Sequence, residues 1–259
     1  MKIVEATWER RNLGRDAWEV TLGREDVADV GKTLAALRDD RFAGAYVCVK
    51  MPVGNLKMLH ALEDDGFRFL ETQFSLIDKF RADDMMDACE TAGEQVKMQV
   101  VEKDKAAWER VISKIVPEMF DSDRISLDPL LGPEIACTRY KNWARDLFDD
   151  PRSVLTVMVL DGEEIAFTVG LWDGRSCRGI LGGLFPEFKS TGYGTVLMAG
   201  PRERTYTMRT EVSSNNPYVL RVHQNFGRVI YKEQYVLRKF MPGPGRGNEP
   251  GESRDGSNG

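Results

Sequence analysis

A basic loop with two glycines, residues 186–194, constrains the fold of this chain more than any other segment. The loop reads Pro-Glu-Phe-Lys-Ser-Thr-Gly-Tyr-Gly; a strand-like apolar run, 179–185, precedes it, and a helix-like run starts at Thr195. A strand that leads through such a loop into a helix N-terminus exposes backbone N–H groups that favour an anion. Glycines at 192 and 194 let the backbone approach that anion closely. The sequence therefore predicts an anion site, with a spacing that fits neither a P-loop nor a Rossmann loop.

Length and composition exclude several classes of protein. A chain of 259 residues can hold one large domain or two small ones. The net charge of −5 argues against a general nucleic-acid binder. No apolar run approaches the ~20 residues that cross a bilayer, and the N-terminus lacks the apolar core of a secretory signal. Four cysteines without a CxxC pair and only two histidines favour reduced thiols and no metal site. We therefore expect a cytoplasmic, soluble protein with no nucleic-acid, membrane or metal partner.

The residue pattern predicts three parts. Residues 1–93 are expected to form an N-terminal α/β subdomain and linker, with a strand at 45–51, a helix from Leu56 to the Asp65-Gly66 stop, and a strand at 67–80. Residues 94–241 form the second unit. Residues 242–259 contain no apolar side chain and are predicted to be a disordered tail.

The second unit is predicted to follow the order β-α-α-β-β-β-α-β-α-β. Its expected strands and helices are, in chain order, strand 95–101, helix 103–120, helix 133–148, strands 154–160, 165–172 and 177–185, a short helix from 195, strand 206–212, helix 216–226 and strand 229–240. Asp161-Gly162 is a strong hairpin signal between two of the strands. The expected fold class is α/β (α+β), with a central mixed sheet flanked by helices.

Two motifs in this order resemble the GNAT acetyltransferase superfamily. The loop 186–194 is similar to the acyl-CoA pyrophosphate loop of that family, which reads Gln/Arg-x-x-Gly-x-Gly/Ala and often follows Pro-Glu-Tyr/Phe. The segment 216–227 is similar to the second signature, in which an Asn opens a helix that ends at a Gly. The resemblance covers about 150 residues and implies the GNAT acyltransferase fold.

The resemblance also implies a co-substrate and the residues that bind it. Acetyl-CoA, or another acyl-CoA, would be the donor, with no metal. Its binding residues would be Gly183, Leu184, Phe185, Lys189, Ser190, Thr191, Gly192, Tyr193, Gly194, Thr195 and Asn216.

The predicted N-terminal subdomain narrows the resemblance to members similar to TDP-fucosamine acetyltransferase. The segments 66–73 and 123–128 and the pair Tyr140-x-x-Trp143 carry this likeness. It suggests a small-molecule amine as acceptor, such as an amino sugar, with Glu71, Arg124 and Asp128 as acceptor-binding residues. The alternative for the two carboxylates is an ordinary solvated surface position.

Acyl transfer to an amine needs a base and benefits from an acid. His223 stands where many GNAT proteins place the tyrosine that protonates the departing thiolate, and an unperturbed pKa of about 6.5 would suit that role. A packed or surface histidine is the alternative, and Tyr218 is a competing acid. Glu211 is the predicted base, with Glu187 as its competitor and a solvated surface position as the alternative for both.

Several departures from the family pattern leave the function open. Lys189 replaces the usual Gln or Arg, Gly200 and Pro201 shorten the helix after the loop, and Arg228 stands at the position of a Phe. The leading hypothesis is an acyl-CoA-dependent N-acetyltransferase. The alternatives are a GNAT that uses a longer or carrier-bound acyl group, and a GNAT-like binding module without catalysis. A homodimer is compatible with the family.

Overall fold

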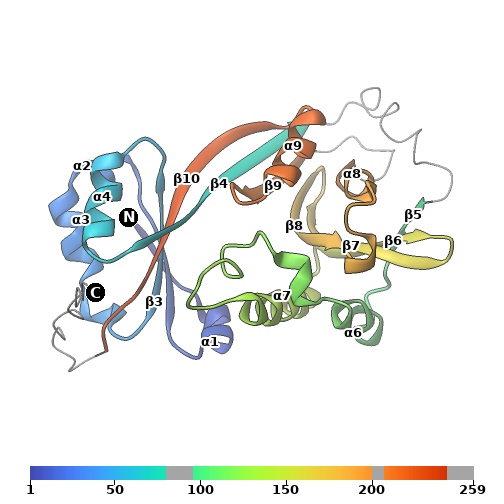
Figure 1. The fold of residues 1–259 in the computed structure, drawn as a ribbon, viewed down its shortest axis with the longest axis horizontal. Coiled ribbons are helices and arrows are strands. Elements are labelled where there is room, and N and C mark those ends of the chain that lie inside the picture. The colour runs from blue at the N-terminus through green and yellow to red at the C-terminus, as the bar shows by residue number, and fades with distance from the viewer. Residues whose placement is uncertain (80–95, 200–206, 244–259) are drawn as a thin grey trace, which may run out of the picture.

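The computed structural model describes residues 1–79, 96–199 and 207–243. Within these residues the strands form a single ten-stranded mixed sheet in the order β1-β2-β3-β10-β4-β9-β8-β7-β6-β5. Two neighbouring pairs, β2 with β3 and β8 with β9, are parallel, and the other pairs are antiparallel. The two long strands β4 and β10 run between two lobes of helices (Figure 1). The predicted mixed α/β class is confirmed.

The elements have the following bounds. The strands are β1 Lys2–Glu5, β2 Ala17–Thr21, β3 Tyr46–Pro52, β4 Arg68–Lys79, β5 Val96–Val100, β6 Ser153–Leu160, β7 Glu163–Asp173, β8 Ser176–Leu184, β9 Thr207–Ser213 and β10 Val229–Phe240. The α-helices are α1 Thr7–Leu13, α2 Arg24–Ala28, α3 Val30–Leu37, α4 Leu56–Asp64, α6 Lys105–Ser113, α7 Pro133–Phe148, α8 Tyr193–Ala199 and α9 Pro217–Asn225. Short 3₁₀ turns are η1 Asp40–Phe42, η3 Pro117–Phe120 and η4 Pro186–Phe188.

Local sequence signals explain where many of these elements start and stop. Helix α7 begins at Pro133, whose fixed φ suits the first helical position and whose missing N–H costs nothing there. Asp161 and Gly162 both have positive φ, 50° and 87°, as a tight hairpin between β6 and β7 requires. Gly66, with φ 91°, follows the end of α4. These three predictions are confirmed.

The single helix predicted at 103–120 is wrong. Helix α6 ends at Ser113, and the 3₁₀ turn η3 begins at Pro117. Proline has no N–H for the helical ladder and forces the residue before it out of the α region. Val116 accordingly adopts φ −131° and ψ 160°. The resulting bend brings Phe120 beneath α7, where its ring stacks on Tyr140 at 3.8 Å.

The chain contains two similar halves that exchange their last strands. Each half has a parallel strand pair, β2 with β3 or β8 with β9, followed by a helix and a final strand. In each, an Asn precedes the helix and a glycine with positive φ follows it, Asn55 with Gly66 and Asn216 with Gly227. Strand β10 inserts between β3 and β4 of the first half, and β4 inserts between β10 and β9 of the second. The sheet therefore continues from one half into the other.

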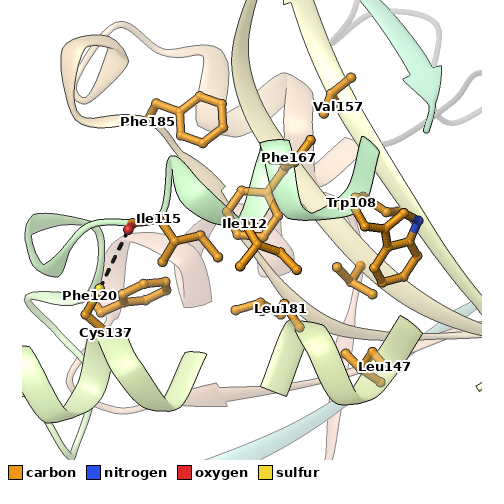
Figure 2. Packing of buried hydrophobic residues seen from close by; sticks show 14 residues of the cluster. Trp108, Ile112, Ile115, Phe120, Cys137, Leu147, Val157, Phe167, Leu181 and Phe185 are labelled. Carbon is orange, nitrogen blue, oxygen red and sulfur yellow. Dashed lines mark hydrogen bonds between the residues drawn. The ribbon is translucent and has the colours of Figure 1, made fainter. Parts of the chain in front are cut away.

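Separate hydrophobic cores hold the two halves. In the second half, α6 and α7 pack Trp108, Ile112, Ile115 and neighbouring side chains against Phe167 and other residues on β6–β8 (Figure 2). In the first half, α3 and α4 cover β2 and β3 on the face of the sheet opposite to the one that α6 and α7 cover. Helix α1 lies against α7 and so links the first half to the second. Between α1 and α7, the central strands of the sheet present mainly polar and charged side chains.

Parts of the sequence predictions lie outside the described residues. The linker predicted at 81–93 and most of the tail predicted at 242–259 belong to this group. The predicted boundary between the N-terminal subdomain and the second unit, at residues 93 and 94, stays a prediction. The described sheet shows only that strands from both sides of that position are hydrogen-bonded neighbours.

Candidate functional site

Strands β8 and β9 pair with each other at one end and have no register with each other over the rest of their described length. The parallel registers are Ser176 with Thr207, Cys177 with Met208, and Arg178 with Arg209. Beyond Arg178, β8 continues to Leu184 and β9 to Ser213 with no further register between them. The facing edges therefore carry backbone groups that a ligand can bind as an added strand would.

A cavity of about 270 Å³, here called the strand-gap cavity, lies along this opening. Residues 179–182 of β8 and 210–213 of β9 line it, together with Asn216, Val219 and His223. Gly182 is required for the local packing, because a Cβ there would lie 2.8 Å from the carbonyl oxygen of Phe167. Glycine thus lets β8 keep close contact with β7 while its other edge stays open.

The loop 186–194 follows the end of β8 and leads into α8. Ser190 and Gly192 both have positive φ, 65° and 87°. The Thr191 hydroxyl donates to the Phe188 carbonyl oxygen at 2.6 Å, and the Thr195 N–H donates to the Gly192 carbonyl at 3.1 Å. The predicted turn from strand to helix is present, with the tight backbone that its glycines suggest.

The Lys189 side chain on this loop is already bound to other residues of the protein. Its ammonium donates to the Glu118 carbonyl oxygen and lies 3.0 Å from a carboxylate oxygen of Asp121. Both side chains remain partly or largely exposed. The predicted contact of Lys189 with an anionic ligand would therefore require the ammonium to exchange Asp121 for that ligand.

Of the other predicted donor-binding residues, Asn216 is the one that lines the strand-gap cavity. Gly183 and Leu184 continue β8 toward the loop, while Phe185 is buried in the core beneath α6 and α7. Asn216 lines the strand-gap cavity, and its side-chain oxygen accepts the Val219 N–H at 3.1 Å, which caps α9. The sequence reasoning missed the β8 residues 179–181. Their signal was the glycine at 179 in a strand.

His223 is buried and lines the strand-gap cavity. Burial, and secondly the positive charge of Arg228, lowers the pKa of His223 to about 3. The guanidinium of Arg228 contacts Nδ1 of the imidazole and can only donate, so the ring proton belongs on Nε2. The premise that this histidine has an ordinary pKa is therefore wrong, and at neutral pH it has no imidazolium proton to give. Its role as catalytic acid stays a prediction that now lacks this support.

The competing acid Tyr218 lies beside the end of the loop 186–194. Its ring is 3.5 Å from the position that a Cβ on Gly194 would occupy, and its hydroxyl is 3.4 Å from that of Thr195. The side chain is exposed. This position suits contact with a ligand bound at the loop better than proton transfer inside the opening.

A second, larger cavity of about 520 Å³ adjoins the first. This polar cavity lies between α1, α7 and the central strands of the sheet, and both halves of the chain line it. Six residues line both cavities, namely Asp123, Tyr140, Gly179, Ile180, Glu211 and Ser213. The predicted base Glu211 is thus placed at the junction of the two cavities.

Two predicted acceptor-binding residues, Glu71 and Arg124, line the polar cavity but are paired with each other. Their charged groups lie 2.7 Å apart, and Glu71 is 2% exposed. Removing one partner of such a pair would leave the other charge buried. Both are placed to shape the cavity, with the carboxylate already bound to the guanidinium.

Asp128 lies elsewhere. It is absent from the residues that line the two cavities, and its carboxylate accepts two hydrogen bonds from Arg238, at 2.6 and 2.7 Å, and one from the Leu130 N–H. Burial raises the pKa of this carboxyl, but the Arg238 and Leu130 hydrogen bonds outweigh it and hold the pKa below its usual value. This geometry argues that Asp128 fixes a loop to β10 and does not reach an acceptor.

The sequence reasoning gave no site role to Asp123, Tyr140 and Trp143, which line the polar cavity. The Tyr140 hydroxyl donates to Asp123 at 2.6 Å, and burial raises the pKa of the phenol well above its usual value. Trp143 stacks beside Tyr140. The helical spacing of Trp108 and Trp143 to apolar neighbours predicts core positions for both. Trp143 packs against the core and also lines the polar cavity. Trp108, predicted to be core, is buried.

The described residues bring together no group of three His, Cys, Asp or Glu side chains that could hold a metal ion. Over the same residues, no helix is long and apolar enough to cross a membrane.

Comparison with solved structures identifies the fold. The chain is similar to a GCN5-related N-acetyltransferase from Sphaerobacter thermophilus, with a TM-score of 0.58 and 13% identity over 93% of this chain and 77% of that one. It is similar to another from Kribbella flavida, with a TM-score of 0.52 and 12% identity over 89% and 82%. It is also similar to a functionally unknown conserved protein from Staphylococcus epidermidis, with a TM-score of 0.59 and 11% identity over 87% of this chain and 85% of that one. No protein-family model and no curated protein matches the chain. At these identities the likeness establishes the GNAT fold alone.

Proposed function

We propose that this protein is an acyl-CoA-dependent N-acyltransferase that transfers an acetyl group to a primary amine of a small polar molecule. The observation that carries the proposal is the opening between β8 and β9, which ends at a glycine-bearing loop on one side and at a second cavity on the other. The amides of a pantetheine arm can hydrogen-bond to the open strand edges as a peptide strand would.

The two ends of the opening suit the two ends of an acyl-CoA. From Leu184 back to Gly179 the strand makes five steps between residues, roughly 17 Å at about 3.3 Å per residue. The loop 186–194 offers backbone N–H groups for the pyrophosphate. The thioester would then lie near the junction of the cavities, where Glu211 is.

The junction supplies what the reaction needs from this chain. The Glu211 carboxylate would accept a proton from the acceptor ammonium, and the neutral nitrogen would attack the thioester carbonyl carbon. A backbone N–H on the open edge of β8 would hold the resulting oxyanion. Collapse of this intermediate breaks the C–S bond and releases the CoA thiolate. The nitrogen loses its second proton to solvent water, and the thiolate takes a proton from solvent, since neutral His223 has none to spare.

The polar cavity would hold the acceptor. Its volume of about 520 Å³ lies within the usual range for small-molecule sites, and its walls combine ion pairs with Trp8 and Trp143. An amino sugar is the acceptor that the sequence resemblance suggests, and hydroxyl groups would find donors and acceptors on these walls.

The test is CoA thiol release from acetyl-CoA with a panel of amines that includes glucosamine, amino acids and polyamines. We expect at least one amine to stimulate release above the background, and Glu211→Gln to lower kcat by 10²–10⁴-fold, as expected for loss of a general base. Lys57→Gln, on the exposed side of α4, is the matched control. Thiol release that no amine stimulates, in a protein that still binds CoA, would instead favour a binding module.

A further inference from the structure

One ion pair lies where β8 and β9 separate. Arg178 is the last β8 residue that pairs with β9, through Arg209, and Glu211 follows two residues later on β9. Both side chains line the polar cavity, and Glu211 also lines the strand-gap cavity. In the function proposed above, an acceptor amine would meet the thioester at this pair.

The pair is held more loosely than its neighbours in the cavity wall. A single contact of 3.3 Å joins Nη2 of Arg178 to Oε1 of Glu211, and the two side chains are 57% and 41% exposed. The buried pair of Glu71 with Arg124 is 2.7 Å apart. Another exposed pair, Arg11 with Asp146, joins α1 to α7 and does not line the strand-gap cavity. An exposed pair with one long contact contributes little, so a ligand can replace it.

We propose that the acceptor is an amine that carries a carboxylate close to its ammonium, as an α- or β-amino acid does. This inference rests on the proposed function and names its substrate class. The ammonium would take the place of Arg178 at Glu211, and the carboxylate would take the place of Glu211 at Arg178. The guanidinium fork can bind a carboxylate through two parallel hydrogen bonds, which fixes the orientation of the acceptor.

The same pair discriminates against amines without an acid group. A simple amine bound at Glu211 leaves the guanidinium beside an ammonium, so two like charges face each other. A molecule with only an acid group would bind the Arg178 guanidinium but would be repelled by the Glu211 carboxylate. Only the zwitterion replaces the Arg178–Glu211 pair with two pairs, its ammonium with Glu211 and its carboxylate with Arg178. It thereby places its nitrogen beside the proposed base.

The test measures binding without turnover. Calorimetry in the presence of CoA would compare alanine, serine, glutamate, lysine and phenylalanine with their carboxamides, which keep the ammonium and lack the carboxylate, and with glucosamine. We expect at least one amino acid to bind about tenfold or more tightly than its carboxamide, as one charge-assisted contact provides. Arg178→Met should abolish that preference, and Arg178→Lys should restore part of it. Arg145→Met is the control, because its exposed pair with Glu109 lines neither cavity.

The outcomes separate this inference from the proposed function. Equal binding of the acids and carboxamides, tighter binding of glucosamine than of any amino acid, or a preference that survives Arg178→Met would overturn the inference. Binding of none of these probes would overturn it as well. If an amino acid binds with the expected preference but no amine stimulates thiol release, the substrate class stands and acyl transfer does not.

Discussion

The buried pair of Asp128 and Arg238 provides the sharpest test of how this fold is held together. Asp128→Ala would leave the Arg238 guanidinium without the two hydrogen bonds that join the loop after η3 to β10. The carboxylate is 0% exposed and the guanidinium side chain 9%. Breaking a buried pair costs about 3–5 kcal/mol, and we expect about 3 because Arg238 can turn toward solvent. For a chain of this size that lowers Tm by roughly 6–12 °C.

The pH dependence gives the same pair a second test. The folded-state pKa of Asp128 is lowered, so its contribution is complete above the unfolded value of about 3.9 and is lost as pH falls through the folded value. The difference in free energy of unfolding between wild type and Asp128→Ala should therefore shrink only below about pH 4.

Calorimetric melting and denaturant unfolding from pH 3 to 8 would measure both effects. Asp39→Ala is the control, since Asp39 makes an exposed pair with Arg41. A Tm no lower than that of this control would refute the structural role. An increased acceptor KM with unchanged stability would return Asp128 to the acceptor site that the sequence suggested.

Three further changes test the opening and its surroundings. Gly192→Asp adds a side chain where φ is 87° and a negative charge at the proposed pyrophosphate site, so CoA affinity should fall at least about tenfold by calorimetry; unchanged affinity would remove the loop from the site. Gly182→Ala places a Cβ against the Phe167 carbonyl and should cost about 1–3 kcal/mol in urea unfolding; a stability equal to wild type would show that β7 and β8 separate freely. His223→Gln should flatten the fall of stability between about pH 6.5 and pH 3, because the unfolded imidazole takes up a proton below about 6.5 and the folded one only near 3; a wild-type slope in this range would place its pKa near the ordinary value.

Short-range signals predicted much of the secondary structure. Pro133, the Asp161-Gly162 turn and the Gly66 stop act on the backbone within a few residues, and each element they bound is present. The error at 103–120 came from reading the apolar stripe past Pro117, although the proline removes the N–H that the helix needs. The order of strands in the sheet depends on contacts far apart in sequence, so local patterns gave no sign that β10 inserts between β3 and β4.

The candidate site was predictable where backbone geometry defines it and less so where side chains choose partners. The strand, loop and helix around Gly192 follow from glycine spacing, and Glu211 was named from its place before Asn216. Sequence alone could not show that Glu71 and Asp128 bind arginines or that Arg228 lies against His223. Burial and charge set the pKa of that histidine, and neither can be read from a motif.

The exchanged strands make one more prediction, about the second unit by itself. Both neighbours of β10, β3 and β4, come from the first 93 residues, and β9 pairs with β8 through only three registers. A fragment of residues 94–241 would therefore expose both edges of a 12-residue strand and one edge of β9. We expect this fragment to unfold without a cooperative transition, and co-expression with residues 1–93 to restore both the transition and CoA binding. A cooperative transition of the fragment alone would show that the second half closes its own sheet, and that the exchange seen here adds stability to a unit that does not require it.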